Sequence, residues 1–290
     1  MRIPARPLIA DGTLDGLRID HVDGLLNPKE YLERLRARAG RTDFYLMVEK
    51  ILAHHEKLRE DWPIDGTTGY EFTNLVLGLL IDPAGEEPLT RFYADWAGEQ
   101  QPLRNIVRDS KLQIMRNEMA SELDVLGREV ARVARQNPGT ADFTHNVLRR
   151  AIREVIACFP VYRTYVDSER PAAKEDRRDL DWAVKQARAN ETDLDPSVFN
   201  FIYSLLSGEI LGEGRVGYSR QAVLRCVRKL QQFSGPVMAK GLEDTAFYRY
   251  NRFIALNEVG GDPRRFGTSI EEFHKPNYGM SSGVCEHSYT

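Results

Sequence analysis

The chain contains few of the residues and patterns that mark membrane, metal-binding or disulfide-bonded proteins. Its 290 residues include only three cysteines, far apart and without metal-type spacing, and six histidines that form no ligand cluster. No apolar run approaches the about 18 residues needed to cross a bilayer, and no apolar signal core begins the sequence. A formal net charge of −3 gives no electrostatic reason to bind nucleic acid or an anionic membrane. We therefore expect a cytoplasmic protein with no metal site, no membrane partner and no nucleic-acid partner.

What the sequence does contain is an arginine and an aspartate at the end of a short apolar strand, in the segment Gly16–Leu25. In an extended chain Arg18 and Asp20 point to the same side, because side chains alternate along a strand. A neighbouring guanidinium favours the ionised carboxylate, which is the form that attacks as a nucleophile. An ordinary salt bridge at a strand end is the alternative interpretation.

A second carboxylate ends another buried run. The segment Phe44–Glu49 is apolar until its last residue, and residues 27–39 between the two runs have helical spacing with Pro28 near the start. Such a strand, helix, strand unit is right-handed and makes its strands parallel neighbours, so that Asp20 and Glu49 lie at the same edge. Glycoside cleavage uses two such carboxylates, about 5–5.5 Å apart in retaining enzymes or about 6.5–9.5 Å in inverting ones. The sequence leaves this spacing open.

Five separate motifs resemble glycoside hydrolase family 13, the α-amylase superfamily. GLRIDHVDG is similar to the strand of that family that bears the nucleophile, and YLMVEKIL is similar to its general-acid strand. Three further segments, Trp62–Tyr70, Phe159–Tyr165 and Gly235–Tyr250, resemble the trehalose-forming branch of the family. The similarity covers about residues 8–274. The resemblance implies that Asp20 is the nucleophile and that Glu49 is the general acid and base.

The fold implied by the resemblance is of the α/β class, a partial (β/α)8 TIM barrel with an inserted helical subdomain. Buried strands are expected near residues 16–20, 44–49, 160–165 and 236–240, corresponding to about the fourth to seventh strands of the family barrel. The expected division is a partial barrel over 1–74, a helical insertion over 75–157, further barrel over 158–274 and a tail unlike the family over 275–290. We therefore expect an internal fragment that needs the missing half of the barrel.

Amphipathic periodicity predicts most of the remaining structure. Apolar residues at i, i+3 and i+4 spacing alternate with charged ones, which is typical of helices that bury one face. The predicted helical segments are 102–136, 142–156, 170–189, 196–211 and 219–233. No internal repeat or low-complexity segment is present.

A third carboxylate is expected from the Gly235–Tyr250 segment. The resemblance implies that Asp244 stabilises the positive charge that develops on the sugar in the transition state. Glu243 is the adjacent competitor for this role. A structural alternative is that Asp244 caps a short helix over Thr245–Tyr250.

Further substrate contacts are expected around these acids, because aromatic faces stack on sugar rings and charged side chains bind hydroxyl groups. The expected substrate-binding residues are Arg18, His21, Trp62, Tyr70, Lys240, Glu243, Tyr248 and Arg249. For the aromatic residues a place in the core is the alternative, and for the lysine a solvated surface position.

The activity implied by the resemblance is an intramolecular transglucosylation. The reducing-end α-1,4 linkage of a maltooligosaccharide would become an α,α-1,1 (trehalose) linkage by a retaining double displacement, with no cofactor. Two alternatives stay open: an α-1,4-glucan hydrolase of the α-amylase type that uses the same acids, and an inactive fragment. The expected partner is therefore a maltooligosaccharide or another α-1,4-glucan.

Overall fold

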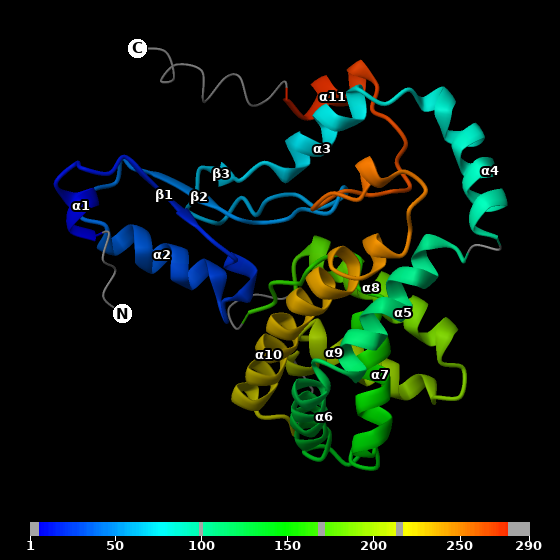
Figure 1. Ribbon diagram of the computed structural model, residues 1–290. Helices are drawn as coiled ribbons and strands as arrows, with labels where there is room; N and C mark the ends of the chain where they lie inside the picture. The colour runs from blue at the N-terminus through cyan, green and yellow to red at the C-terminus, as the bar shows by residue number, and fades with distance from the viewer. Residues whose placement is uncertain (1–5, 99–100, 168–171, 213–216, 278–290) are drawn as a thin grey trace.

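The computed structural model describes residues 6–98, 101–167, 172–212 and 217–277. These residues form a small parallel sheet with its covering helices at one end and a bundle of longer helices at the other (Figure 1). Most of the predicted 275–290 tail, including Cys285, lies outside the described residues. In the part of the chain that the structure describes, no helix combines the length and the apolar character needed to cross a bilayer.

The sheet contains three parallel strands, β1 (Gly16–Ile19), β2 (Tyr45–Val48) and β3 (Gly66–Thr67), in the order β1-β2-β3. Helix α2 (Pro28–Arg38) connects the first two strands, and Asn27 caps it by accepting a hydrogen bond from the Glu30 amide. The short helix α1 (Arg6–Ala10) precedes β1. The predicted strand, helix, strand unit is therefore confirmed.

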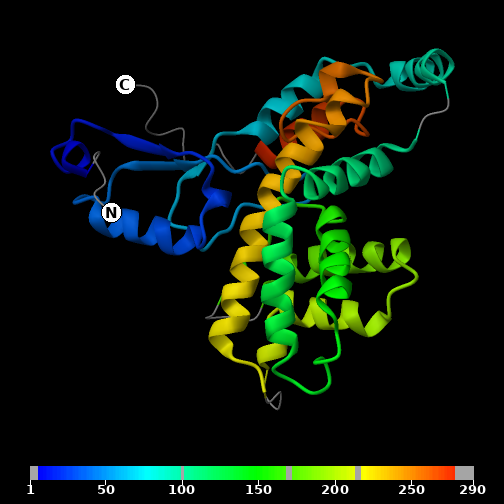
Figure 2. The same cartoon turned by 60° about the horizontal axis from the view of Figure 1, so that its bottom comes forward.

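The remaining helices all follow β3 in the chain. They are α3 (Tyr70–Leu79), α4 (Glu86–Ala97), α5 (Leu103–Arg116), α6 (Ala120–Ala134), α7 (His145–Ala157), α8 (Lys174–Asn190), α9 (Pro196–Leu206), α10 (Arg220–Met238) and α11 (Ile270–Asn277). Helices α5 to α10 form the bundle, and α10 runs from its far end toward the sheet (Figures 1 and 2). The five predicted helical segments all contain helices in the structure, and the first contains two.

One apolar core holds the bundle together. It joins buried side chains from Leu112 to Val237, whereas a separate core lies under the sheet and includes Leu32, Leu46 and Val48. The core of the bundle continues from α5 through α8, α9 and α10.

Residues 236–240 were expected to form a buried strand, and this expectation is wrong. They form the end of α10 and the start of a π-helical turn, Ala239–Glu243. The apolar residues before and within this segment, Leu230, Phe233 and Val237, are spaced three and four apart and are all buried. The helical stripe therefore continues through Pro236, beyond the helix predicted over 219–233.

Residues 160–165 do not form a strand either, and at the end of this segment side chains of neighbouring helices take the place of a partner strand. The Val166 amide donates to Gln231 Oε1 at 2.7 Å, and the Tyr165 amide donates to Asp176 Oδ1 at 3.0 Å. Thr164 likewise donates through its hydroxyl to Gln231. The sequence reading also missed β3, which is only two residues long. The described chain is therefore mostly helical with a small parallel sheet.

Candidate active site

Asp20 and Glu49 lie at the same edge of the sheet, as the sequence predicts. Ile19 of β1 pairs with Val48 of β2, and the next amide, that of Glu49, donates to the Ile19 carbonyl at 2.8 Å. Both acids therefore follow directly from paired positions on parallel neighbours. The pairing of β1 with β2 thus brings the two acids to one edge of the sheet.

Arg18 links these two carboxylates. Its Nη1 atom lies 2.7 Å from Asp20 Oδ1, and its Nη2 atom lies 3.7 Å from Glu49 Oε1. The Asp20 side chain is 70% exposed and that of Glu49 is 22% exposed. The Arg18 guanidinium thus contacts both the exposed Asp20 carboxylate and the more enclosed Glu49 carboxylate.

Tyr70 approaches Glu49 from the start of α3. Its hydroxyl donates to Glu49 Oε1 at 3.3 Å. Burial, followed by the nearby Glu49 carboxylate, raises the pKa of Tyr70, so this hydroxyl stays a hydrogen-bond donor. Gly69, with φ at +79°, makes the sharp turn that begins α3 at this point.

Glu243 faces the same group of side chains from the π-helical turn. Tyr162 donates its hydroxyl to Glu243 Oε1, and the Gly260 amide donates to the same atom at 3.4 Å. Burial raises the pKa of Glu243, and neighbouring acids including Glu49 raise it further. Burial also raises the pKa of Tyr162, with Glu243 adding to the effect. Glu243 is therefore the more enclosed of the two adjacent acids in this segment.

Asp244, the expected third carboxylate, is exposed and follows the π-helical turn directly. Its amide donates to the Ala239 carbonyl at 3.1 Å. The turn is pressed against α5, because a Cβ atom on Gly241 would lie 2.9 Å from the Cα atom of Lys111. π-Helical turns occur frequently at functional sites.

The remaining expected substrate contacts have different surroundings in the structure. Trp62 is buried in the core under the sheet, where its ring meets Tyr165 edge-on, so packing accounts for it. Arg249 donates to Ser110 and Gln113 of α5. The side chains of Lys240 and Tyr248 are exposed. His21 lies beside Glu49 and contacts it through its backbone amide.

A buried charge network beneath the acids was not predicted. Lys50 forms ion pairs with Glu56 at 2.8 Å and Asp23 at 3.3 Å, and the Tyr165 hydroxyl donates to Asp23. The Tyr165 ring also lies within 5.6 Å of three cationic groups, those of Lys50, Arg59 and Arg163. One signal could have found Lys50: burial alternates from Leu46 to Lys50, so the Lys50 side chain points into the core when that of Glu49 points out.

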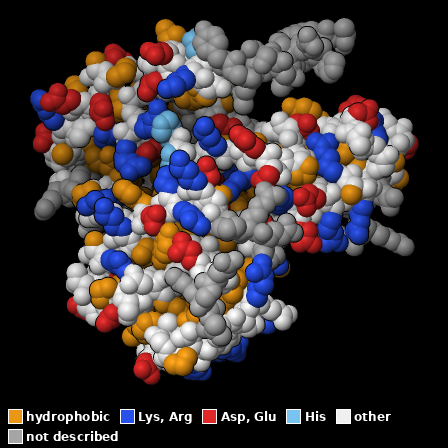
Figure 3. Space-filling model, turned by 180° about the vertical axis from the view of Figure 1, so that it is seen from behind, with side chains coloured by type: hydrophobic (Ala, Val, Ile, Leu, Met, Phe, Trp, Pro, Cys, Tyr) orange, Lys and Arg blue, Asp and Glu red, His pale blue; other side chains and the backbone are white. Residues whose placement is uncertain are grey.

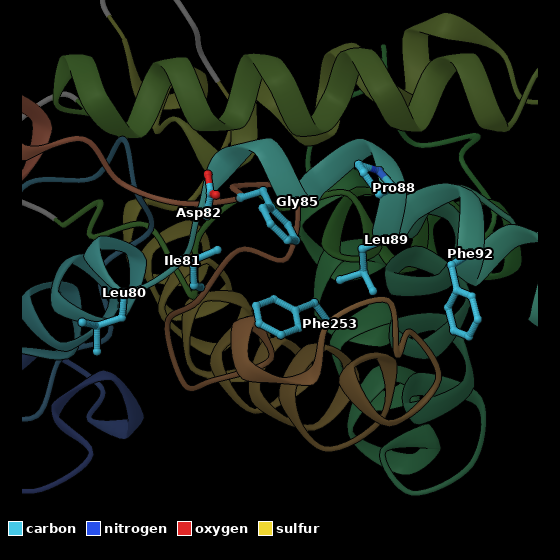
Figure 4. Close-up of a pocket in the computed structure, with 9 residues that line it drawn as sticks. Leu80, Ile81, Asp82, Gly85, Pro88, Leu89, Phe92 and Phe253 are labelled. Atoms are coloured by element: carbon cyan, nitrogen blue, oxygen red, sulfur yellow. The ribbon is translucent and has the colours of Figure 1, made fainter.

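A shallow apolar hollow of about 500 Å³ lies elsewhere, between α3, α4 and the segment near Phe253 (Figure 4). Its lining includes Leu80, Phe92 and Phe266 and none of the expected catalytic acids. We place the candidate active site at the carboxylates rather than at this hollow, because the hollow offers little chemistry beyond apolar contact.

On the face seen from behind, lysine and arginine side chains gather across the middle of the molecule (Figure 3).

The two carboxylates follow neighbouring parallel strands and contact one arginine, and enzymes that cleave glycosidic bonds commonly use a pair of carboxylates. No family model matches the chain. Two curated proteins of Mycobacterium tuberculosis, from strains CDC 1551 and H37Rv and each named "Putative maltooligosyl trehalose synthase", are 35% identical to it over 264 residues. That match covers 91% of this chain and 31% of each relative.

Solved structures give the same result. Maltooligosyltrehalose synthase from Arthrobacter ramosus matches with a TM-score of 0.78 and 34% identity, over 95% of this chain and 32% of that one. A structure titled DSM5389 glycosyltrehalose synthase matches with a TM-score of 0.68 at 34% identity, over 95% of this chain and 30% of that one. The chain is therefore homologous to part of the maltooligosyl trehalose synthases, and it spans about a third of the length of these relatives.

Proposed function

We propose that the chain carries the catalytic carboxylates of an intramolecular transglucosylase that makes a trehalose end on a maltooligosaccharide. The observation that carries the proposal is the contact of one guanidinium, that of Arg18, with both Asp20 and Glu49 at adjacent strand ends. The homology to maltooligosyl trehalose synthases supports the same reaction. Maltooligosaccharides are the substrate class that follows from it.

In the proposed reaction Glu49 protonates the oxygen of the reducing-end α-1,4 linkage while Asp20 attacks the anomeric carbon. The bond to the terminal glucose breaks, and a covalent β-glycosyl ester forms on Asp20. Glu49, now a carboxylate, takes the proton from the anomeric hydroxyl of the released glucose, which attacks the ester carbon. The product has an α,α-1,1 linkage, Asp20 is regenerated, and no water is consumed.

Around these two acids we propose supporting roles for other residues. Asp244 would stabilise the positive charge on the sugar, and Tyr70 and Glu243 would bind hydroxyl groups beside Glu49. Arg18 would hold Asp20 as the ionised nucleophile, and the His21 ring would contact the sugar beside it. The exposed side chains of Lys240 and Tyr248 would contact a longer substrate, whereas Trp62 is buried against Tyr165 and the exposed Arg249 would have to leave Ser110 and Gln113 to bind sugar.

Retaining the released glucose requires a closed pocket, and the site of this chain is open on the side of Asp20. We propose that the three-stranded sheet is part of a (β/α)8 barrel whose other strands come from regions present in the longer relatives. Closing the site would exclude water and favour glucose as the acceptor. The chain alone is then expected to have little activity.

Hydrolysis of α-1,4-glucans is the second candidate. The 70% exposure of the Asp20 side chain favours it, because water has free access to an ester formed there. The two acids would play the same roles, and water would replace glucose in the second step.

The test uses maltopentaose, with reducing ends and trehalose-capped products measured separately by chromatography. The purified chain is assayed alone and together with the remaining segments of a full-length homologous synthase. We expect trehalose-capped product from the combined preparation and little from the chain alone. A gain of reducing ends without capped product would support the hydrolase instead, and no product of either kind from the combined preparation would overturn both.

Variants decide whether the named acids are responsible. Glu49→Gln is expected to reduce the rate about 100- to 10,000-fold, the range that general acid–base groups contribute. Asp20→Asn should abolish the covalent intermediate. Asp15→Asn is the matched control, because Asp15 is an exposed acid at the opposite end of β1. Equal losses in all three variants would contradict the assignment.

A further inference from the structure

His21 has an unusual backbone conformation for a residue beside a catalytic acid. Its φ and ψ angles are 48° and 49°, in the left-handed region. Among the residues that the structure describes, it is the one non-glycine residue with positive φ. Histidine, asparagine and aspartate enter this region more readily than other side chains, but the conformation still costs free energy and persists only where the surroundings hold it.

The amide of His21 contacts Glu49 where the chain enters this left-handed turn. The His21 backbone N–H donates to Glu49 Oε2 at 2.8 Å. Two residues earlier, the carbonyl of Ile19 accepts from the Glu49 amide at 2.8 Å. The end of β1 therefore fixes Glu49 twice, once through its main chain and once through its carboxylate.

Two neighbouring residues hold this turn in place. The Gly24 amide donates to the His21 carbonyl at 3.0 Å, and a Cβ atom on Gly24 would overlap the His21 ring. Between them Asp23 is buried and accepts from the Tyr165 hydroxyl. Asp23 thus anchors the turn to the core, and the lack of a side chain at Gly24 leaves space for the His21 ring.

We propose that His21 is a positioning residue for Glu49 and acts through its left-handed backbone. The consequence for catalysis rests on the proposed function, whereas the contact itself does not. Because an N–H group can only donate, Oε2 of Glu49 acts as the acceptor in this contact. The other oxygen, Oε1, lies 3.3 Å from the Tyr70 hydroxyl and 3.7 Å from Arg18 Nη2, so the His21 amide holds the carboxylate from the side opposite to these two groups.

The contact can be tested without catalysis by hydrogen exchange of the His21 amide, measured by NMR on the full chain. In Glu49→Ala the acceptor is lost, and we expect exchange of this amide to become about tenfold faster or more, since a hydrogen-bonded amide must open before it exchanges. Tyr70→Phe is the matched control, because it removes a contact to the other oxygen and should leave the rate unchanged. Equal exchange in wild type and Glu49→Ala would overturn the proposal.

The effect on catalysis is tested in the combined preparation described above. His21→Val, whose branched side chain disfavours the left-handed region, should lower kcat by about ten- to a hundredfold, the cost of misplacing a reacting group. His21→Asn and His21→Gly keep the conformation accessible and should retain most of kcat, with any lost sugar contact of the ring appearing in KM. Loss of kcat in His21→Gly equal to that in His21→Val would overturn the backbone role.

Gly24 provides an independent variant. Gly24→Ala should displace the His21 ring and lower kcat, whereas Gly66→Ala should not, because a Cβ atom on Gly66 meets nothing within 4 Å. Equal kcat in the two variants would contradict the anchoring role of Gly24. If the combined preparation forms no product in any variant, the proposed function fails, and the exchange measurement alone decides the position of Glu49.

Discussion

Two buried lysines, one in the sheet-bearing region and one in the helical bundle, differ in what surrounds the charge. The Nζ atom of Lys50, two residues after β2, lies 2.8 Å from a carboxylate oxygen of Glu56 and 3.3 Å from one of Asp23. Lys111, in α5, is as deeply buried, but its Nζ atom donates to the carbonyl of Phe159 at 2.9 Å. One cation is matched by two anions, and the other meets a neutral acceptor.

The difference appears in the direction of the two pKa shifts. Burial acts to lower the pKa of Lys50, but the adjacent carboxylates of Asp23 and Glu56 more than offset it, and the net shift is upward. Burial lowers the pKa of Lys111 to about 8. The region beneath the candidate active site therefore uses its buried charges as a matched set, whereas Lys111 in the bundle is a charge that burial disfavours.

The largest predicted effect comes from breaking the matched set. Lys50→Met leaves the Asp23 and Glu56 carboxylates buried without their cation, and we expect it to lower the free energy of unfolding at pH 7 by about 3–5 kcal/mol. Urea unfolding followed by circular dichroism measures this loss. A loss below about 1 kcal/mol, the value typical of exposed pairs, would show that water or a rearrangement replaces the lysine.

The pH dependence of the same variant follows from Glu56. Burial raises the pKa of Glu56, and the charge of Lys50 opposes this rise in the wild type. The Lys50→Met variant lacks that opposing charge. A carboxyl whose folded-state pKa is raised destabilises the fold fully above that pKa, and the penalty declines as the pH falls from the raised value to the ordinary value of 4.5. The penalty of Lys50→Met should therefore shrink as the pH falls. Glu56→Gln in the Lys50→Met background should recover part of the loss at pH 7.

A smaller loss is predicted for Tyr165→Phe, which keeps the ring among its cations and removes only the hydroxyl. That hydroxyl donates to the buried Asp23 carboxylate, and hydrogen bonds to charged groups contribute about 1.5–3 kcal/mol. The same unfolding assay measures it. If the variant were as stable as wild type, Lys50 and Arg163 would have to satisfy Asp23 without the tyrosine.

How much of this the sequence predicts depends on how local each signal is. The strand, helix, strand unit was predictable because Asn27, Pro28 and two apolar runs specify it within some thirty residues. The neighbouring positions of Asp20 and Glu49 followed from that unit, since right-handed crossovers make parallel neighbours.

The long-range parts of the structure were not predictable in the same way. The apolar run at 160–165 resembles a strand, yet its backbone groups pair with Gln231 and Asp176, which lie on helices distant in sequence. Val237 fits a strand or a helix equally well until the stripe it extends is known. The left-handed backbone of His21 leaves no sequence signal beyond a residue type that tolerates it.

The role of Lys111 in the helical bundle is tested by measuring the free energy of unfolding of Lys111→Met as a function of pH. Between the folded-state pKa of about 8 and the ordinary value of 10.5, the unfolded state binds more protons than the folded state, so Lys111 makes stability rise with pH. The stability of the variant relative to wild type should therefore fall across this interval by up to about 1.4 kcal/mol per pH unit. Below pH 8 the variant should be as stable as wild type or more stable. A pH-independent difference would show that Lys111 has an ordinary pKa.

The smallest effect is predicted for Cys158→Ala, which removes the titratable group nearest to Lys111. Burial raises the pKa of the Cys158 thiol to about 12, so the thiol is still neutral when Lys111 loses its proton near pH 8. A neutral thiol exerts no Coulomb force on the ammonium, and the change in stability at pH 7 should stay within about 1 kcal/mol. The difference between Lys111→Met and wild type should follow the same pH curve with or without Cys158. A curve displaced by the substitution would mean that the thiol is ionised beside the lysine, and Lys111 would then have an anionic partner as Lys50 does.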